Sequence, residues 1–450
     1  MKLTLIGAGV RSPLFAAVAL RRAERLGLDE LYLLDTDGDR LALFTTLIRQ
    51  QAREAGSLVR ISSGTAAGAA LEGARHVVIT IRVGGEQGRV IDERTALAPG
   101  VLGQETTGPG GFAMALRNVP VVLGYAELLE RLSPGAWLYS FTNPAGLVTQ
   151  ALRDAGFARA IGICDSANAA QHAVARFLDL DVRDLQADVY GLNHLSWTSR
   201  VRHGGRDLLS GLLADASFRS GTSLSLFEPG LIDLLGVWPN EYLYYFYDAD
   251  RAVAEICRRD VTRGEQVRDA TASLLAELRA MRPDDDPGAA LARFHAYHRT
   301  RSATYLAGAR HVATQGEEPA AWGADDEESY AAVMLDVVEA LETGGPMFTA
   351  LNVPNRGAIG GMADDDVVEV SCTVDEHGVR PLPIGTVPPA QLALMRAVKT
   401  YERLTVAAIQ SRSRQLAVQA LMCHPLVLTY PRARALVDDY LAAHQRYLGW

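Results

Sequence analysis

The sequence predicts an α/β fold, with an N-terminal Rossmann-like doubly wound sheet and a mostly α C-terminal region that carries a small sheet. Two observations predict it. Short, continuously apolar runs alternate with helix-like stretches over the first two hundred residues, which is typical of a parallel sheet covered on both faces. A glycine-rich turn, Gly7-Ala8-Gly9, follows the first of these runs and precedes a helical stretch, where a dinucleotide-binding turn stands.

Six apolar runs are the candidate strands of this sheet. Each is short and is bounded by polar or glycine-rich residues. They span residues 3–6, 31–34, 59–61, 76–81, 137–142 and 158–164. Helical patterns at 13–26 and 40–55 separate the first three runs. Six strands alternating with helices is the pattern of a doubly wound, dinucleotide-binding sheet.

The pattern changes after Val189. Stretches near 205–280, 325–345 and 389–447 have helical character, and residues 367–374 alternate like a strand with one exposed face. We therefore expect an NAD-binding domain over residues 1–195 and a mostly helical catalytic and oligomerisation domain over residues 196–450.

Composition excludes several classes of protein. The chain has 450 residues, of which 48% are hydrophobic and 22% charged, as in a globular enzyme. Its 44 basic and 53 acidic residues give a net charge of −9, which argues against a nucleic-acid partner. Four cysteines without a CxxC pair do not form a disulfide scaffold. No apolar stretch reaches the roughly 20 residues of a membrane span, so we expect a cytoplasmic protein without a membrane partner.

The first strand and turn predict a nucleotide site. Gly7 and Gly9 let the backbone turn sharply, so that a pyrophosphate can approach the N-terminus of the next helix. Ser12 stands where the third glycine of such a turn is usual, with Arg11 beside it. Asp35 ends the second strand, where a carboxylate can accept hydrogen bonds from both ribose hydroxyls and favours NAD over NADP.

Polar clusters follow several of the predicted strands. Because the carboxyl ends of the strands line the ligand crevice of an open α/β sheet, we expect these clusters to converge there. A thiolate and an imidazole at such strand ends can hold a divalent ion, but thirty residues between Cys164 and His194 is not a metal motif, and each can equally be a buried core residue. The clusters are residues 82–85 with Arg89, 104–111, 142–144, 163–165 and 191–194.

Taken together, these motifs resemble glycoside hydrolase family 4, and within it the 6-phospho-β-glucosidase branch. The resemblance is collinear over essentially the whole chain, and the combination of GQETTGPGG with GLNH is its most specific part. The matching motifs are GAG at 7–9, RVGG at 82–85, GQETTGPGG at 103–111, TNP at 142–144, ICD at 163–165, GLNHLSW at 191–197, YLYY at 242–245 and NVPNRG at 352–357.

The resemblance implies hydrolysis by transient oxidation, an exception to the two-carboxylate scheme of most glycosidases. Bound NAD+ takes hydride from C3 of the sugar, a base removes the acidified C2 proton, the C1 substituent is eliminated, and water then adds before the hydride returns. The resemblance also implies that Cys164 and His194 hold Mn2+ or another divalent metal, which acts as a Lewis acid on the sugar oxygens. The family further suggests a homodimer or homotetramer.

The resemblance assigns roles to two further side chains. Tyr242 is the matching candidate for the base at C2. A nearby cation lowers the pKa of a tyrosine toward the operating pH, which a base needs. The alternative is that Tyr242 belongs to a packed aromatic cluster with its tyrosine neighbours. Asp165, which follows Cys164, is the candidate general acid to the leaving oxygen.

Other residues are expected to bind substrate or cofactor. Arg89 matches the position associated with the sugar 6-phosphate, which a guanidinium can bind through two oxygens; its alternative is a solvated surface arginine. Glu105, Asn143 and Asn193 are the expected partners of sugar hydroxyls or a metal-bound water. The residues expected at the cofactor are Gly7, Gly9, Arg11, Ser12, Asp35 and Arg82.

Departures from the family pattern leave alternatives open. Asp165 is typical of 6-phospho-α-glucosidases, whereas many β-enzymes have Asn there, and Ser166-Ala167 replaces a more usual apolar-Pro pair. The same mechanism on α-linked or non-phosphorylated sugars is therefore an alternative. Two further alternatives are an NAD-dependent 2-hydroxy-acid dehydrogenase and a nucleotide-sensing protein without catalysis.

Overall fold

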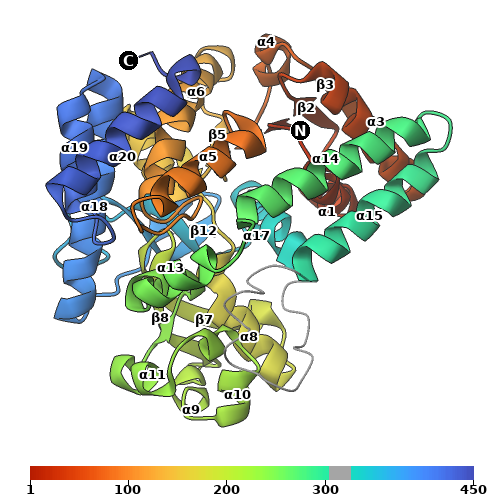
Figure 1. Cartoon of the computed structure of the whole chain (residues 1–450). Coiled ribbons are helices and arrows are strands. Elements are labelled where there is room, and N and C mark those ends of the chain that lie inside the picture. Colours follow the sequence, from red (N-terminus) through yellow and green to blue (C-terminus); the bar gives the residue numbers. More distant parts are fainter. Residues whose placement is uncertain (304–325, 450) are drawn as a thin grey trace.

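The computed structural model describes residues 1–303 and 326–449, and the side chains of 301–303 and 326–330 lie outside that description. Residue 325 of the predicted 325–345 helix and the last residue of the predicted 196–450 domain also lie outside it. Figure 1 shows the N-terminal strands and α3 at one side of the molecule and helices α18–α20 at the other.

A nine-stranded sheet forms the centre of the fold, in the order β13-β12-β11-β6-β5-β4-β1-β2-β3. Its parallel part, β3-β2-β1-β4-β5-β6, has the strand order of a dinucleotide-binding sheet, as the sequence predicts. These strands are β1 (Lys2–Ile6), β2 (Glu30–Leu34), β3 (Arg60–Gly64), β4 (His76–Ile79), β5 (Trp137–Ser140) and β6 (Ala160–Gly162).

The helices that connect or follow these strands cover the sheet, and their apolar faces join its core. They are α1 (Ser12–Arg21), α2 (Ala23–Leu26), α3 (Gly38–Glu54), α4 (Ala67–Leu71), α5 (Gly85–Leu97), α6 (Pro109–Leu132), α7 (Ala145–Asp154) and α8 (Ala169–Leu178). The predicted helix at 13–26 is thus divided into α1 and α2, with Arg22 between them.

Three strands from the C-terminal region extend the same sheet. They are β11 (Met347–Pro354), β12 (Val367–Asp375) and β13 (Gly378–Pro381), and all pair antiparallel. Asn352 of β11 pairs with Gly162 of β6, which joins the C-terminal strands to the parallel part. The large sheet therefore contains strands from both sides of residue 195, and the division into domains at that residue stays a prediction.

A second sheet contains β7 (Leu185–Leu192), β8 (Leu195–His203), β9 (Arg206–Asp207) and β10 (Trp238–Pro239). Strands β7 and β8 form a hairpin in which Leu192 pairs with Leu195, so that Asn193 and His194 make a two-residue turn. The sequence pattern after Val189 indicated helices and did not predict this hairpin. The turn projects His194 from a rigid element.

Helices dominate the rest of the chain, as expected. They are α9 (Leu209–Leu212), α10 (Ala216–Ser220), α11 (Pro229–Leu235), α12 (Tyr244–Tyr247), α13 (Ala249–Cys257), α14 (Arg263–Met281), α15 (Pro287–Ala303), α17 (Asp326–Thr343), α18 (Pro389–Ser411), α19 (Arg414–Cys423) and α20 (Tyr430–Ala443). Single-turn helices include η1 (Ser166–Asn168) and η4 (Glu241–Leu243). In Figure 1, α14 and α15 lie beside α1 and α3, and a separate buried apolar cluster joins them to α3.

Helix α6 corrects the expectation that no apolar stretch reaches membrane-spanning length. Among the described residues it is the one helix long and apolar enough to cross a membrane. However, 61% of its most apolar window is buried inside the protein, a pattern that the core helix of a globular fold shares. Buried Arg117 within it pairs with Asp92 of α5, as expected of a packed helix.

Candidate active site

A cavity of about 1320 Å³ opens at the carboxyl ends of the parallel strands. Residues of the β1–α1 turn, the end of β2, the loops after β4, β5 and β6, the β7–β8 turn and the segment 241–245 all line it. The predicted site residues that line the cavity are Gly7, Gly9, Arg11, Asp35, Arg82, Arg89, Glu105, Asn143, Cys164, Asp165, His194 and Tyr242. Ser12 and Asn193 do not line it.

The nucleotide end of the cavity is built around the Gly7–Gly9 turn. Gly7 has φ +88°, and a Cβ there would lie 3.0 Å from the carbonyl carbon of Thr80, so only glycine fits without strain. Ser12 is buried, and its hydroxyl donates to the carbonyl of Gly9 at 2.6 Å. Ser12 therefore braces the turn, while the residues around it face the cavity.

Asp35 ends β2 at the same end of the cavity. Only 6% of it is exposed, and its Oδ1 accepts hydrogen bonds from the backbone N–H of Asp37 at 3.0 Å and from Nη2 of Arg40 at 2.9 Å. These bonds fix the carboxylate at the rim where an adenosine ribose lies in this type of sheet.

Glu105 stands on a loop whose glycines are sterically required. A Cβ on Gly110 would lie 2.1 Å from the carbonyl oxygen of Gln104, and one on Gly111 would lie 1.8 Å from that of Thr106. The side chain of Gln104 accepts the backbone N–H of Thr106 at 2.7 Å, which tightens the same loop. The GQETTGPGG motif thus folds as a compact turn before α6 and presents Glu105 to the cavity.

Arg82, Arg89 and Glu105 form a charged group on one wall of the cavity. Nη2 of Arg82 lies 2.6 Å and Nη1 of Arg89 lies 3.3 Å from a carboxylate oxygen of Glu105, and Nε of Arg89 donates to Glu93 at 2.8 Å. Burial alone would raise the pKa of Glu105, but the two arginines hold it well below its usual value. Arg89 is 6% exposed, so it is not a solvated surface residue.

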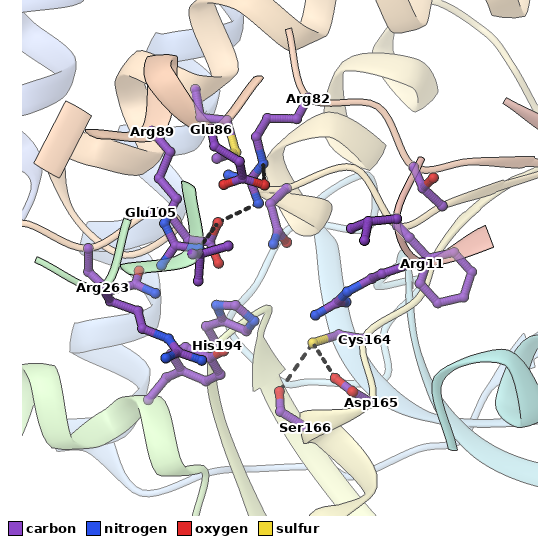
Figure 2. A pocket seen from close by; sticks show the side chains of 18 of the residues that line it. Arg11, Arg82, Glu86, Arg89, Glu105, Cys164, Asp165, Ser166, His194 and Arg263 are labelled. Atoms are coloured by element: carbon purple, nitrogen blue, oxygen red, sulfur yellow. Dashed lines mark hydrogen bonds and ion pairs between the residues drawn. The ribbon is translucent and has the colours of Figure 1, made fainter. Parts of the chain in front are cut away.

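Cys164 and His194 come from different elements but line the same cavity. Cys164 follows β6, and His194 occupies the β7–β8 turn with φ +61°. Both are buried, at 8% and 5% exposure. Figure 2 shows Cys164, with Asp165 and Ser166, on one side of the pocket and His194 on the other.

The two side chains fit a divalent metal. Burial lowers the pKa of His194 to about 3, so its imidazole is neutral, and its Nδ1 is buried without a hydrogen-bond partner. Burial, together with Asp165 and Glu369, raises the pKa of Cys164, which disfavours a thiolate unless a cation stands beside it. Across residues 1–303 and 326–449, no group of three or more His, Cys, Asp or Glu side chains is arranged to hold a metal. Two protein ligands would leave the remaining positions to substrate or water.

Tyr242 lies directly against His194. Their rings stack with centroids 3.6 Å apart and planes within 2°. Tyr242 stands in η4, which begins after Asn240, and the side chain of Asn240 accepts the Tyr242 backbone N–H at 3.0 Å. Burial raises the pKa of neighbouring Tyr245 to about 12, and the Tyr247 hydroxyl accepts a hydrogen bond from Trp197. Tyr242 itself packs against Tyr245, with ring centroids 6.2 Å apart, so it belongs to this aromatic cluster and also stacks on the imidazole.

Asn193 has a partner that the sequence did not indicate. Its Nδ2 donates at 3.2 Å to Glu369 of β12, which is fully buried and also accepts hydrogen bonds from Ser196 and Asn352. Burial raises the pKa of Glu369 to about 7, against the effect of these hydrogen bonds. A single acid inside the apolar run VVEVSCTV was the available signal for this residue. Arg263, at the start of α14, also lines the cavity, and no motif pointed to it.

The chain matches known proteins over its whole length. Residues 2–180 match the model of family 4 glycosyl hydrolases, and residues 189–427 match that of the family 4 glycosyl hydrolase C-terminal domain. It is 28% identical to a "probable 6-phospho-beta-glucosidase" of Bacillus subtilis, covering 100% of this chain and 97% of the relative. It is also 28% identical to the phospho-alpha-glucosidase PagL of Clostridium acetobutylicum, covering 98% and 97%.

A solved structure agrees with these sequence matches. The 6-phospho-beta-glucosidase of Thermotoga maritima, determined with manganese, NAD+ and glucose-6-phosphate, aligns with a TM-score of 0.83 and 26% identity. The alignment covers 100% of this chain and 99% of that chain. On the strength of both family models and of this alignment, the chain belongs to glycosyl hydrolase family 4.

Proposed function

We propose that the chain hydrolyses 6-phospho-β-glucosides with NAD+ and Mn2+, or another divalent metal, as cofactors. The two relatives named as phospho-glucosidases match 100% and 98% of the chain, and the Thermotoga maritima 6-phospho-beta-glucosidase structure holds manganese, NAD+ and glucose-6-phosphate. The observation that carries the proposal is that one cavity brings together the Gly7–Gly9 turn, Asp35, Cys164, His194 and Tyr242.

The chain's own residues divide the cavity into a cofactor end and a metal end. Gly7, Gly9 and Asp35 would hold the dinucleotide, with Ser12 bracing their turn. The other two residues proposed at the cofactor are Arg11 and Arg82. Cys164 and His194 would hold the metal. When bound, NAD+ supplies a reversible hydride acceptor for C3 and the metal supplies a Lewis acid for the sugar oxygens.

Two side chains would move protons. Tyr242 would take the proton from C2, since its ring lies against the imidazole that faces the metal position and its backbone is fixed by Asn240. Asp165, which lines the cavity beside Cys164, would protonate the leaving oxygen. These transfers need no net oxidation, so the aglycone is released without accumulation of NADH.

The remaining residues would bind the sugar phosphate. The carboxylates of Glu93 and Glu105 orient the guanidinium of Arg89, which would contact the 6-phosphate. Asn143 and Glu105 would bind sugar hydroxyls. Asn193 does not line the cavity, and its amide donates to Glu369, so in place of the expected substrate contact we propose that it holds the turn that presents His194.

A second candidate function is the hydrolysis of 6-phospho-α-glucosides. Asp165 favours it, because Asp at this position resembles the α-enzymes, and one of the relatives is a phospho-alpha-glucosidase. The two candidates share every cofactor and differ in the side of the ring from which the aglycone leaves.

A panel of aryl α- and β-glucosides, with and without a 6-phosphate, tests the proposal. Assays contain NAD+ and Mn2+ under reducing conditions, because oxidation of the Cys164 thiol would destroy a metal ligand. We expect turnover only of phosphorylated substrates, a preference for the β-anomer, and no activity in Cys164→Ser. Equal turnover of unphosphorylated glucosides would contradict the role of Arg89. Net NADH formation from a 2-hydroxy acid would favour a dehydrogenase instead.

We also propose the homodimer or homotetramer that the family resemblance suggests, and the two-domain division at residue 195. Sedimentation analysis measures the first, and limited proteolysis near the boundary measures the second. A monomer at assay concentrations would contradict the proposed oligomer. A chain that is cleaved first within 1–195 would contradict the proposed division into domains.

A further inference from the structure

Three polar side chains lie together at the metal end of the cavity; two of them are buried, and the third, Ser166, is half-buried and lines the cavity. They are Ser166 of η1, Ser196 of β8 and Asn240 before η4, and we call them the Asn240 cluster. Nδ2 of Asn240 donates to the hydroxyls of Ser166 at 3.2 Å and Ser196 at 3.3 Å. Asn240 and Ser196 are 3% and 2% exposed, so water does not replace these bonds.

One arm of the cluster reaches the sulfur of Cys164. The Oγ of Ser166 lies 3.1 Å from Sγ of Cys164, and either atom could donate in the free thiol. A metal-bound thiolate has no proton, so Ser166 must then be the donor and its lone pairs remain for the Asn240 amide. The Ser166 hydroxyl then donates to the sulfur and accepts from Asn240, so Asn240 helps to fix its orientation.

The second arm reaches Tyr242. Because Nδ2 of Asn240 faces the two serines, its Oδ1 faces the other way and accepts the backbone N–H of Tyr242 at 3.0 Å. The Tyr242 ring stacks on His194. The side-chain amide of Asn240 thus connects the Ser166 hydroxyl, which lies beside the thiol, to the backbone of Tyr242, whose ring contacts His194.

The third arm anchors the hairpin that carries His194. The hydroxyl of Ser196 donates to Oε2 of Glu369 at 2.8 Å, and Asn193 donates to Oε1 of the same carboxylate at 3.2 Å. Ser196 and Asn193 flank His194 in β8 and the β7–β8 turn. The cluster is therefore tied to each of the three segments that present Cys164, His194 and Tyr242.

We propose that Asn240 is a positioning residue that couples the metal thiolate to the C2 base. Through Ser166 it fixes the hydrogen bond to the sulfur, and through its Oδ1 it fixes the start of η4, so that the sulfur and Tyr242 keep one mutual position. The proposal rests on the proposed roles of Cys164 and Tyr242. A role confined to capping η4 would involve only the Oδ1 arm.

Two single variants separate the arms. Asn240→Asp keeps an oxygen for the Tyr242 N–H and loses the donor to both serines, whereas Ser166→Ala removes only the hydroxyl beside the sulfur. Ser166→Thr restores a hydroxyl. Ser199→Ala is the matched control, because Ser199 lies on the same strand as Ser196 and its hydroxyl bonds only the carbonyl of Asp188.

Two measurements report on the metal site directly. Cobalt(II)-loaded protein with NAD+ should show a thiolate-to-metal charge-transfer band, and Mn2+ affinity is measured by electron paramagnetic resonance titration. We expect Ser166→Ala and Asn240→Asp each to shift the band and weaken Mn2+ binding about tenfold, in the range of other residues that support metal ligands. We expect the double variant to be no worse than either single one, Ser166→Thr to restore the band, and kcat to fall more than KM changes.

Different results identify different failures. A band and a Mn2+ affinity that stay unchanged in both single variants would overturn the proposal while leaving the proposed function intact. A wild-type protein without a charge-transfer band would overturn the metal role of Cys164 and the inference with it. Additive losses in the double variant would show independent effects and would also overturn the coupling. Should Asn240→Asp fail to fold, Ser166→Ala, which deletes one oxygen, still tests the arm that reaches the sulfur, and an unchanged band and Mn2+ affinity in that variant alone would overturn the proposal.

Discussion

Cys164 shows how burial makes the metal site depend on pH. Burial and the nearby carboxylates raise the pKa of the thiol, so the thiol keeps its proton at neutral pH when no cation is present. Binding of a metal must then expel that proton. We predict that Mn2+ affinity rises with pH, by about tenfold per unit as long as the thiol is protonated in the free protein. Titrations in buffers of different ionisation enthalpy measure both the affinity and the proton release.

Cys164→Ala provides the control for this prediction. Without the thiol, the remaining imidazole is already neutral near pH 7, because burial lowers the pKa of His194 to about 3. The variant should bind Mn2+ weakly and with little pH dependence. A wild-type affinity that stays flat between mildly acidic and mildly alkaline pH would show that the thiol is not a ligand.

Asp35 is the residue expected to make the site prefer NAD+ over NADP+. Its carboxylate is fixed by Arg40 and by the Asp37 backbone, and it faces the cavity. Hydrogen bonds to a charged group contribute about 1.5–3 kcal/mol, so Asp35→Ala should weaken NAD+ binding about 10- to 100-fold. The variant should also discriminate less against NADP+, since a like charge no longer faces the 2′-phosphate. Fluorescence titration with NADH and NADPH measures both effects, and unchanged NADH affinity would refute the assignment.

The residue scale also shows what sequence could and could not provide. Cys164, His194 and Tyr242 could be singled out only through the family resemblance, because thirty residues of spacing carry no metal signature. Cys164 and His194 stand in the clusters that were expected to converge at the ligand crevice, and they line one cavity with Tyr242, which no strand-end pattern indicated. The partners of Asn193 and Ser12 were not predictable, since they depend on which way a side chain turns from a tight loop.

At the scale of elements, apolar runs in the sequence predicted the strands of the parallel sheet. The inner parallel strands are mostly apolar because both faces of the sheet are covered, whereas the edge strand β3 (RISSG) is polar and not buried. All six strands lie close to their expected places. The strands from β7 to β11, and β13, were missed. Residues 185–192 mix polar and apolar side chains, and β11 is defined by pairing with strands far away in the sequence. Such long-range pairing leaves no short periodic signal.

The packing of α3 against α14 and α15 gives a prediction on stability. Leu47 of α3 is fully buried in an apolar cluster with Leu274, Leu278 and Phe294. Leu47→Ala should lower the free energy of unfolding by about 2–5 kcal/mol through lost contacts and a residual cavity. Leu58→Ala is the control, because that side chain is fully exposed and its loss should change stability by less than about 0.5 kcal/mol. Equal denaturation midpoints for the two variants would contradict the packing.

At the scale of the whole molecule, a buried polar group joins the C-terminus to the cavity wall. Arg117 of α6 bonds both carboxylate oxygens of Asp92, at 2.8 and 2.6 Å, and His444, just after α20, lies 2.7 Å from the same carboxylate. Arg117 also donates to the carbonyl of Val83, in the loop that carries Arg82. The C-terminal helices in Figure 1 are thereby linked to a loop that lines the cavity.

Removing one partner of this buried polar group should lower the free energy of unfolding more than replacing both partners with apolar residues. Asp92→Ala leaves the guanidinium of Arg117 buried without its carboxylate, and we predict a loss of about 3–5 kcal/mol in the free energy of unfolding. The double variant Asp92→Leu with Arg117→Met removes both charges and should lose less than the single variant. Urea denaturation of both proteins measures the difference. A double variant less stable than Asp92→Ala would show that the pair itself, and not the uncompensated charge, dominates.

The most direct measurement concerns the hydrogen at C2 of the sugar. Hydrolysis of an aryl 6-phosphoglucoside is carried out in D2O with NAD+ and Mn2+, and the glucose-6-phosphate formed is analysed for deuterium by nuclear magnetic resonance. Because a base exchanges the C2 proton with solvent before water adds at C1, we predict deuterium at C2 and no net NADH. Product that retains its C2 hydrogen throughout turnover would contradict elimination through C2 and, with it, the function proposed for this cavity.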